Sequence, residues 1–576
     1  MAYNTLLIAN RKILHRITAE VIEEQFAERL EDFYYDLVEH YSNTDMREKA
    51  IEYLEKSGEK ARASHDNEKA IEFYNRLLLI LKDSEDYSGL RIDTLLKKGK
   101  MLGFIGKWNK PKHVYEEALH FSQAIDDKGR MGETHLALSY MFLLQGDFAQ
   151  AMGHYETSLT LFQTINDQAG ISKAIRCMGY AYYNRGDYDA AMACFENALK
   201  ICEKLGDKMG ISFDIGYMGN VHYSQGNYDA AMTCYEKKFK ICEELGDKVG
   251  TSKVIGYMGN VYYNQGDYDA AMACFEKMLK ICEELGNKLD ISRVVGYMGN
   301  VYYNRGDYDM AMAYYEKNLK LCKELGYKLG LSASVGIIGF VHRDQGDYDT
   351  AMAYLERALT IREELEDKRG IAASVGNIGV IYLAKGDYDA AMACFEKALT
   401  ISEKLGYKKG ISIVVHYMGI VYKDKDDYDT AIACYNRAIA IGRNLGIKPF
   451  LCGYLISKAE ILFLQQLFDE AQVLNSEGLQ IAEEVGKKET IFQGKVLSTK
   501  IDFTLGHREK AVALLSEMLA QIEDKAEQAD LHYELYQCGV EREEHGKEAL
   551  RLYQELYAKT PKFEWKKRIA ELEMES

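Results

Sequence analysis

The sequence predicts an all-α solenoid, in which helix hairpins stack into one continuous superhelix. The chain has 576 residues and only 3 prolines, whereas an average usage of about 5% would give roughly 29. This depletion favours long helices broken by glycine turns over a β-sandwich or barrel. The chain also matches itself strongly at a shift of 40 residues. A fixed period of this length is typical of solenoids, whose units bury their apolar faces against their neighbours.

The repeated unit is marked by the string Gly266-Asp267-Tyr268-Asp269-Ala270-Ala271-Met272. Near-copies begin at Gly146, Gly186, Gly226, Gly306, Gly346, Gly386 and Asp426, and the phase continues more weakly at Gly106-Lys107-Trp108, Gln466-Leu467-Phe468 and Gly506-His507-Arg508. We therefore predict a superhelix over residues 86–520. The segments 1–85 and 521–576 fall out of the 40-residue phase and are predicted to be helical caps.

Within one unit, the apolar residues have helical spacing on both sides of the Gly-Asp turn. After Gly306 they are Tyr308, Ala311, Met312, Tyr315, Leu319 and Cys322, and before it they are Val294, Val295, Met298, Val301 and Tyr302. Asp307 is placed to cap the second helix, and the preceding glycine suits the tight turn. The small residues Gly299 and Ala311 are predicted to lie where the two helices cross. Each unit is thus predicted to be a helix hairpin.

The net charge of −17 disfavours a dedicated binder of nucleic acid or of anionic membranes, because such proteins need a positive field. No stretch approaches the roughly 20 apolar residues of a membrane span, and the start of the chain has too short an apolar run for a secretory signal. The expected location is therefore the cytoplasm.

Motifs that carry chemistry are missing from the sequence. It contains no P-loop, no His-Glu-x-x-His and no Gly-x-Ser-x-Gly. The twelve cysteines lack metal-ligand spacing and are predicted to be reduced core thiols. We predict no catalytic residue, no metal site and no cofactor, so the chain is not expected to be an enzyme.

The string Met-Gly-x-x-Tyr-x-x-x-Gly-Asp-Tyr-x-x-Ala-Met-x-x-Phe/Tyr-Glu-x-x-Leu resembles the tetratricopeptide repeat. These units have 40 residues instead of the usual 34, and Leu-Gly-Asp-Lys replaces the closing proline of the family. They are similar to the longer repeats of the polarity adaptors that bind peptides through a Leu-Gly-Asn motif, written here Met218-Gly219-Asn220. The resemblance implies a right-handed superhelix.

Both ends of the chain resemble a further class of protein. The stretch from Ile13-Leu14-His15-Arg16 to Glu52-Tyr53-Leu54, and the tail from Leu556 to Trp565, look like the region downstream of the ATPase in bacterial proteins that join a nucleotide cyclase or kinase domain to a STAND-type ATPase and repeats. This resemblance gives an alternative function: a regulatory or sensor arm of such a signalling protein.

In a superhelix of hairpins the first helices line the concave face, so a residue repeated there forms a ladder. One predicted ladder is Asn220, Asn260 and Asn300, and a second, three residues further on, is Tyr183, Tyr223, Tyr263 and Tyr303. Asparagine both donates and accepts, which suits the backbone of an extended peptide. Recent duplication of nearly identical units would also copy these residues without any binding role, and the sequence leaves both interpretations open.

Positions that vary between copies suggest a charge preference. Lys173, Lys253 and Arg293 stand where other units have Phe213, Ala333, Ala373 and Ile413, and Arg176 lies close to them. Together these cations would make the first half of the groove basic. The sequence thus predicts a non-enzymatic scaffold that binds a protein or peptide partner, either acidic or through its C-terminal carboxylate, in the concave groove.

Overall fold

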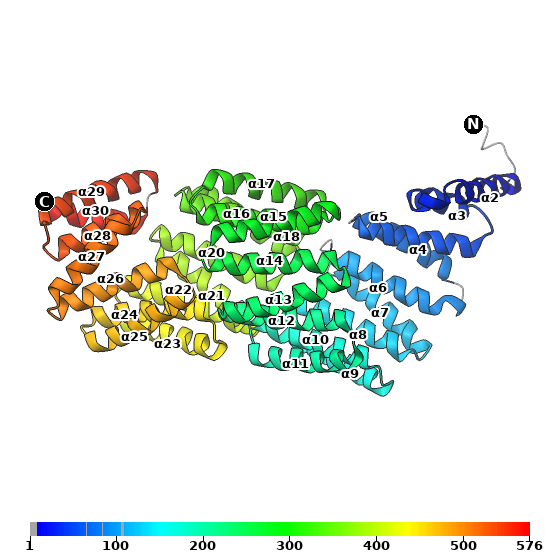
Figure 1. The fold of residues 1–576 in the computed structure, drawn as a ribbon, viewed down its shortest axis with the longest axis horizontal. Helices are drawn as coiled ribbons and strands as arrows, with labels where there is room; N and C mark the ends of the chain where they lie inside the picture. The colour runs from blue at the N-terminus through cyan, green and yellow to red at the C-terminus, as the bar shows by residue number, and fades with distance from the viewer. Residues whose placement is uncertain (1–7, 65, 83–84, 105–108, 561, 576) are drawn as a thin grey trace.

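The computed structural model describes residues 8–575 apart from 65, 83–84, 105–108 and 561, and over these residues the chain is helical, with no β-strand (Figure 1). The prediction of an all-α solenoid is confirmed. From α6 to α25, each even-numbered helix packs most extensively on the odd-numbered helix that follows it, so the repeating unit is the predicted hairpin. The weak repeat at Gly106-Lys107-Trp108 lies outside the described residues.

The helices fall into an entry segment, a series of hairpins and a final segment. The entry segment contains α2 (Ile8–Gln25), the 3₁₀ helix η1 (Ala27–Phe33), α3 (Tyr34–Ser42), α4 (Arg47–Ala63), α5 (Asn67–Leu81) and η2 (Glu85–Tyr87). The hairpins are α6 (Ser88–Phe104) with α7 (Asn109–Ala124), α8 (Lys128–Leu144) with α9 (Phe148–Thr164), α10 (Gln168–Arg185) with α11 (Tyr188–Leu205), α12 (Lys208–Gln225) with α13 (Tyr228–Leu245), α14 (Lys248–Asn264) with α15 (Tyr268–Glu284), α16 (Lys288–Asn304) with α17 (Tyr308–Glu324), α18 (Lys328–Asp344) with α19 (Tyr348–Glu364), α20 (Lys368–Ala384) with α21 (Tyr388–Lys404), α22 (Lys408–Asp424) with α23 (Tyr428–Leu445), α24 (Lys448–Leu464) with α25 (Phe468–Glu484), and α26 (Lys488–Thr504) with α27 (Arg508–Gln521). The final segment contains α28 (Lys525–Gln537), α29 (Arg542–Lys559) and α30 (Phe563–Glu575). The division into domains at residues 85 and 520 stays a prediction.

The turn inside each hairpin follows from its Gly-Asp pair. The Asp307 carboxylate accepts a hydrogen bond from the backbone N–H of Met310 at 3.1 Å, which caps α17 as predicted. Gly306 has φ 78°, in the left-handed region that a residue without Cβ enters most easily. Gly306 and Asp307 therefore let α16 end at Asn304 and α17 begin at Tyr308, with three residues between the two helices.

Gly299 and Ala311 lie at the crossing of α16 and α17, where Ala311 is fully buried. A Cβ atom on Gly299 would lie 2.7 Å from Cε1 of Tyr315, which is closer than packed carbon atoms approach. The tyrosine ring of the second helix therefore rests directly on the backbone of the first. This contact explains why a glycine stands at this position of the repeat.

Replacing Gly299 with alanine is expected to lower the free energy of unfolding by about 1–3 kcal/mol, because the added methyl group overpacks the contact with Tyr315. Gly153→Ala is the matched control, since Gly153 is an exposed glycine within α9 and a Cβ there meets no atom within 4 Å. That control is expected to stabilise the protein by about 0.5–1 kcal/mol. Urea unfolding followed by circular dichroism measures both changes, and equal changes would contradict the crossing geometry.

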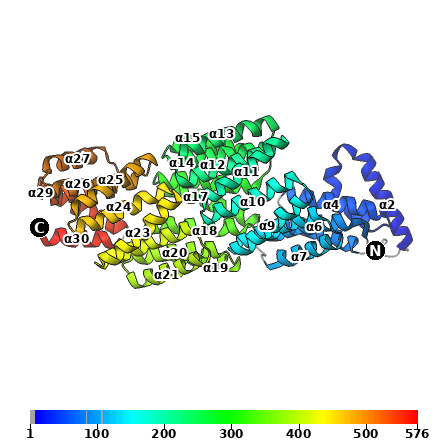
Figure 2. The same cartoon turned by 90° about the horizontal axis from the view of Figure 1, so that it is seen from below.

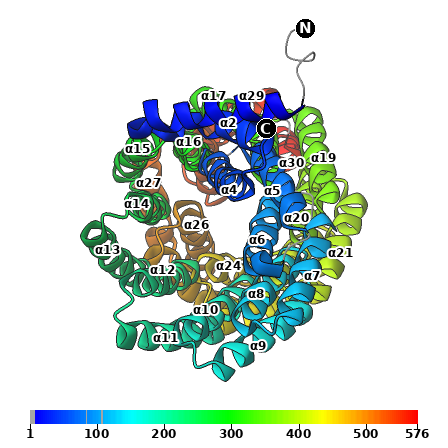
Figure 3. The ribbon, with the colours of Figure 1, turned by 90° about the vertical axis from the view of Figure 1, so that its right-hand side faces the viewer.

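The hairpins wind around a common long axis. Seen along this axis, α10, α12, α14 and α16 lie nearer the centre than α11, α13 and α15, so the first helices form the inner wall (Figure 3). The chain advances along the axis from α2 at one end to α30 at the other (Figure 2). The predicted concave face is therefore made by the even-numbered helices.

Successive turns of the superhelix touch along a surface that we call the inter-turn seam. It contains Gly146, Asn184, Tyr188, Gln225 and Tyr228 from the first turn and Arg369, Leu405, Leu445 and Val485 from the second. The Gln225 side-chain amide donates to the carbonyl of Leu445 at 3.5 Å, across 220 residues of sequence. Leu445 shares a core cluster with Tyr188, and Val485 shares one with Tyr228.

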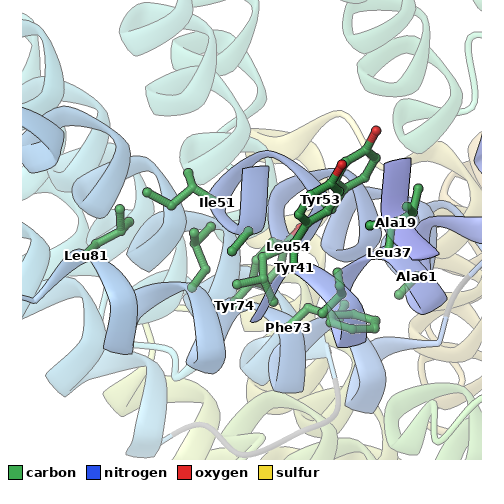
Figure 4. Packing of buried hydrophobic residues seen from close by; sticks show 14 residues of the cluster. Ala19, Leu37, Tyr41, Ile51, Tyr53, Leu54, Ala61, Phe73, Tyr74 and Leu81 are labelled. Carbon is green, nitrogen blue, oxygen red and sulfur yellow. The ribbon is translucent and has the colours of Figure 1, made fainter. Parts of the chain in front are cut away.

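The entry segment has a core of its own. Tyr41 and Tyr53 stack with ring centroids 5.5 Å apart, next to Leu37, Leu54 and Tyr74 (Figure 4). Both tyrosine hydroxyls donate to the Glu23 carboxylate. This segment thus buries its apolar residues without the 40-residue period. Over the described part of the chain, no helix is both long and apolar enough to cross a membrane.

Candidate functional site

The candidate site is the inner wall formed by α10, α12, α14 and α16. The helices carry both predicted ladders: Tyr183 lies on α10, Asn220 and Tyr223 on α12, Asn260 and Tyr263 on α14, and Asn300 and Tyr303 on α16. Each of these side chains is half-buried. The structure therefore places them in two adjacent rows on the helices nearest the axis.

The tyrosine row links neighbouring repeats through hydrogen bonds. The hydroxyl of Tyr183 lies 2.9 Å from Oγ of Ser224, and the side-chain amide of Asn264 donates to the hydroxyl of Tyr223 at 2.6 Å. The next two tyrosines make the same kind of contact, Tyr263 with Asn304 and Tyr303 with Asp344. Each contact joins residues 41 positions apart. This row therefore has a structural role, and it fixes the relative orientation of successive hairpins.

The partners of the tyrosines were missed by the sequence analysis, although the sequence carries a signal for them. The position that follows the tyrosine row is polar in five consecutive repeats, as Asn184, Ser224, Asn264, Asn304 and Asp344; it follows a tyrosine in the first four and Arg343 in the fifth. Burial raises the pKa of Tyr263 to about 12, so this hydroxyl keeps its proton near neutral pH. Because Tyr223 and Tyr263 accept from asparagine amides, their own protons are available to donate to a ligand.

The asparagine row uses its carbonyl oxygens within the protein. Tyr235 donates to Oδ1 of Asn220 and Tyr315 donates to Oδ1 of Asn300, each at 2.8 Å. In the intervening repeat Phe275 stands at the position of this tyrosine and has no hydroxyl to donate to Asn260. The amide N–H groups of Asn220 and Asn300 are consequently the part of this row that can serve a ligand, and they suit backbone carbonyls.

Three of the four predicted cations already have a carboxylate partner. Lys173 pairs with Glu133 at 2.6 Å and Arg293 with Asp290 at 2.8 Å. Arg176 binds the buried Asp214 with two nitrogens, at 2.6 and 3.0 Å. Of the described residues, none forms an ion pair with Lys253. The positive charge available to an acidic ligand is thus smaller than the number of cations implies, and the basic groove stays a prediction.

Arg293 also lines a cavity. Together with Tyr140, Tyr327 and Lys100 it surrounds a space of about 240 Å³ between the first and second turns of the superhelix. Burial lowers the pKa of the Lys100 ammonium. In the part of the chain that the structure covers, no three His, Cys, Asp or Glu side chains are grouped so that they could hold a metal ion.

A comparison with protein families identifies the repeats. The model described as "Tetratricopeptide repeat" matches residues 171–244, 214–284, 290–364, 331–404 and 370–444. The repeats of residues 171–444 are therefore tetratricopeptide repeats, as the sequence resemblance predicted. No curated protein matches this sequence.

Several solved structures are similar in fold. A Rap protein in complex with the competence and sporulation factor is 14% identical with a TM-score of 0.44, over 62% of this chain and 98% of that one. The apo form of RapI is 16% identical with a TM-score of 0.37, over 48% and 99%. Aspartyl phosphate phosphatase F from Bacillus subtilis is 14% identical with a TM-score of 0.40, over 62% and 94%.

Proposed function

We propose that this chain is a non-enzymatic, cytoplasmic scaffold that holds a peptide or an extended partner segment in the groove of its superhelix. Tetratricopeptide solenoids present extended concave surfaces of this kind, and contact with a protein partner is the usual role of such repeats. The groove would take a segment that is acidic or ends in a carboxylate. No nucleic acid or membrane partner is proposed, because the net charge of −17 opposes both.

One observation supports the groove assignment most directly. The Oδ1 atoms of Asn220 and Asn300 are held by Tyr235 and Tyr315, so each amide group is fixed in orientation. The amide N–H groups of Asn220 and Asn300 therefore occupy equivalent positions in two repeats that are two periods apart. A row of fixed donors binds the carbonyls of an extended chain without requiring particular side chains.

The test uses two sets of substitutions. Changing Asn220, Asn260 and Asn300 together to aspartate keeps an oxygen acceptor for the tyrosines but removes the amide donors, so partner binding is expected to be lost while the fold is kept. The control is Asn197→Ala with Asn436→Ala, because both residues are exposed on the outer helices α11 and α23. Proteins captured from the source cell by each variant are compared by quantitative mass spectrometry, with circular dichroism as the folding check. Equal capture by all three proteins would remove the groove assignment.

A further inference from the structure

A second cavity lies at the inter-turn seam, where α8, α9 and α10 face α18, α20 and the turn before α22. Its volume is about 430 Å³, within the roughly 300–1,000 Å³ that is typical of pockets for small ligands. The walls are largely apolar: Leu143, Leu144, Phe148 and Tyr180 belong to the first turn, and Leu329 and Leu405 to the second. This cavity can therefore accept an apolar side chain, and residues from both turns would contact it.

Arg369 reaches across the seam at this cavity. Its Nη1 donates to Oδ1 of Asn184 at 3.1 Å, and its guanidinium lies 4.1 Å from the ring centroid of Tyr407. No carboxylate of the described residues forms an ion pair with it. Most other repeats have an aliphatic residue at this position, as at Met209, Val249, Leu289 and Leu329. The sequence thus places an arginine at the seam with its charge not neutralised.

Arg362 is the second unusual cation in this cavity. Its Nη1 donates to the carbonyl of Gly370 and to Oγ of Ser374, both at 2.8 Å. Its Nε is buried and has no hydrogen-bond partner among the residues that the structure describes. Burial lowers the pKa of this guanidinium, which is the effect of desolvation without a paired carboxylate. Most other repeats have a small residue at this position, as at Cys202, Cys242, Cys282, Cys322, Ser402 and Gly442, although Phe162 is large.

The charges that line the cavity do not cancel. Arg185 is paired with Asp187 at 3.0 Å and lies 4.0 Å from the ring centroid of Phe148. Asp367 is the carboxylate of the lining, and it accepts the backbone N–H of Gly370 at 2.9 Å to cap α20. Arg362 and Arg369 carry two positive charges and Asp367 carries one negative charge, so these three residues keep one net positive charge. The whole protein, in contrast, has a net charge of −17. The cavity is therefore suited to a single negative charge attached to an apolar group.

We propose that this seam cavity binds a carboxylate next to an apolar side chain, as at the C-terminus of a peptide that ends in a large apolar residue. The proposal rests on the peptide-binding function above and names the place where the carboxylate would be held. The carboxylate accepts hydrogen bonds from Arg362 and Arg369, and the apolar side chain packs on Phe148 and Leu405. The cavity lined by Arg293 shares Leu144 and Leu329 with the seam cavity. The residue before the C-terminal residue of the peptide would therefore lie in this neighbouring cavity.

Binding is measured with defined probes on the full chain. The peptide probe is acetylated Gly-Ala-Gly-Ala-Phe with a free C-terminal carboxylate, compared with the same peptide amidated at its C-terminus. The free-acid probe is N-acetylphenylalanine, compared with its amide. Isothermal titration and ligand-observed NMR give the dissociation constants. We expect amidation to weaken peptide binding about 10-fold or more, because hydrogen bonds to a charged carboxylate are lost.

Three variants test the assignment of residues. Arg362→Met and Arg369→Met are each expected to abolish the preference for the free carboxylate, and Arg369→Lys to keep part of it. Arg551→Met is the control, since Arg551 is exposed on α29 and paired with Glu548. Two results would overturn the proposal. One is a preference for the free carboxylate that is equal in wild type and in both methionine variants, and the other is equal affinity of the wild type for the acid and the amide.

The two proposals can fail separately. Peptide binding that ignores the carboxylate but is lost in the Asn220, Asn260 and Asn300 variant would overturn the seam site and leave the proposed function standing. If N-acetylphenylalanine binds as tightly as the peptide and this binding depends on Arg362 and Arg369, the carboxylate site is supported and its ligand is a small free acid.

Discussion

Replacing Asp214 with alanine is expected to lower the free energy of unfolding by about 3–5 kcal/mol, because Arg176 would be left as a buried charge without a partner. The side chain of Asp214 is fully buried and that of Arg176 is 14% exposed. Burial raises the pKa of Asp214, although the hydrogen bonds from Arg176 act in the opposite direction. Hydrogen exchange of α10 and α12 measures the local effect, and urea unfolding the global one.

The control for this pair is Lys173→Ala. Lys173 pairs with Glu133, but both side chains are more than a third exposed, so its removal is expected to change stability by less than about 1 kcal/mol. The double variant Arg176→Ala with Asp214→Val is expected to recover most of the loss, because other repeats have Val254, Val294 and Val414 at the position of Asp214. If Asp214→Ala and Lys173→Ala had equal effects, the buried pair would not contribute to the fold as argued.

This pair also shows the limits of assigning site residues from the sequence. Arg176 was predicted to attract an acidic ligand, since it stands on the inner face next to Lys173. Its partner Asp214 lies 38 residues away, on the neighbouring repeat. Such a pair can be recognised only when the packing of adjacent hairpins is known. The variation between copies identified the unusual position, but it did not indicate whether the charge serves a ligand or the fold.

The hairpins themselves could be predicted because their determinants are local. The helical spacing around Gly306, the capping residue Asp307 and the small residue Gly299 all act within one 40-residue unit. The tyrosine row was also found, since it repeats with the period. Its hydrogen bonds to the next repeat, such as that of Tyr183 with Ser224, were missed because they connect the side chains of two different units.

The inter-turn seam could not be predicted, because it depends on the pitch of the superhelix. Leu205 and Leu445 hold the same position in their repeats. Leu205 is 47% exposed and Leu445 is 4% exposed. The same contrast separates Leu245, at 40%, from Val485, at 1%. Residues with equal local sequence thus have different environments, since a preceding turn covers only the later ones.

The contrast at the seam leads to a matched prediction. Leu445→Ala is expected to lower the free energy of unfolding by about 2–5 kcal/mol, as for other truncations of buried leucines, while Leu205→Ala is expected to change it by less than about 0.5 kcal/mol. The two substitutions remove the same atoms from the same point of the repeat. The difference between their effects on the free energy of unfolding therefore measures the contact of the second turn with Tyr188 and Phe195, without the contribution of the hairpin itself.

A shape measurement separates loss of the seam from loss of the hairpin. Leu445→Asp places a carboxylate in the apolar cluster of Tyr188 and Ile447, where an unpaired charge is strongly disfavoured, so the turns are expected to separate. Small-angle X-ray scattering should then show a larger radius of gyration, while circular dichroism should keep its helical signal because the hairpins do not depend on the seam. Leu205→Asp should leave both unchanged. If Leu445→Asp kept the wild-type radius of gyration, the turns would be held together by contacts other than this cluster.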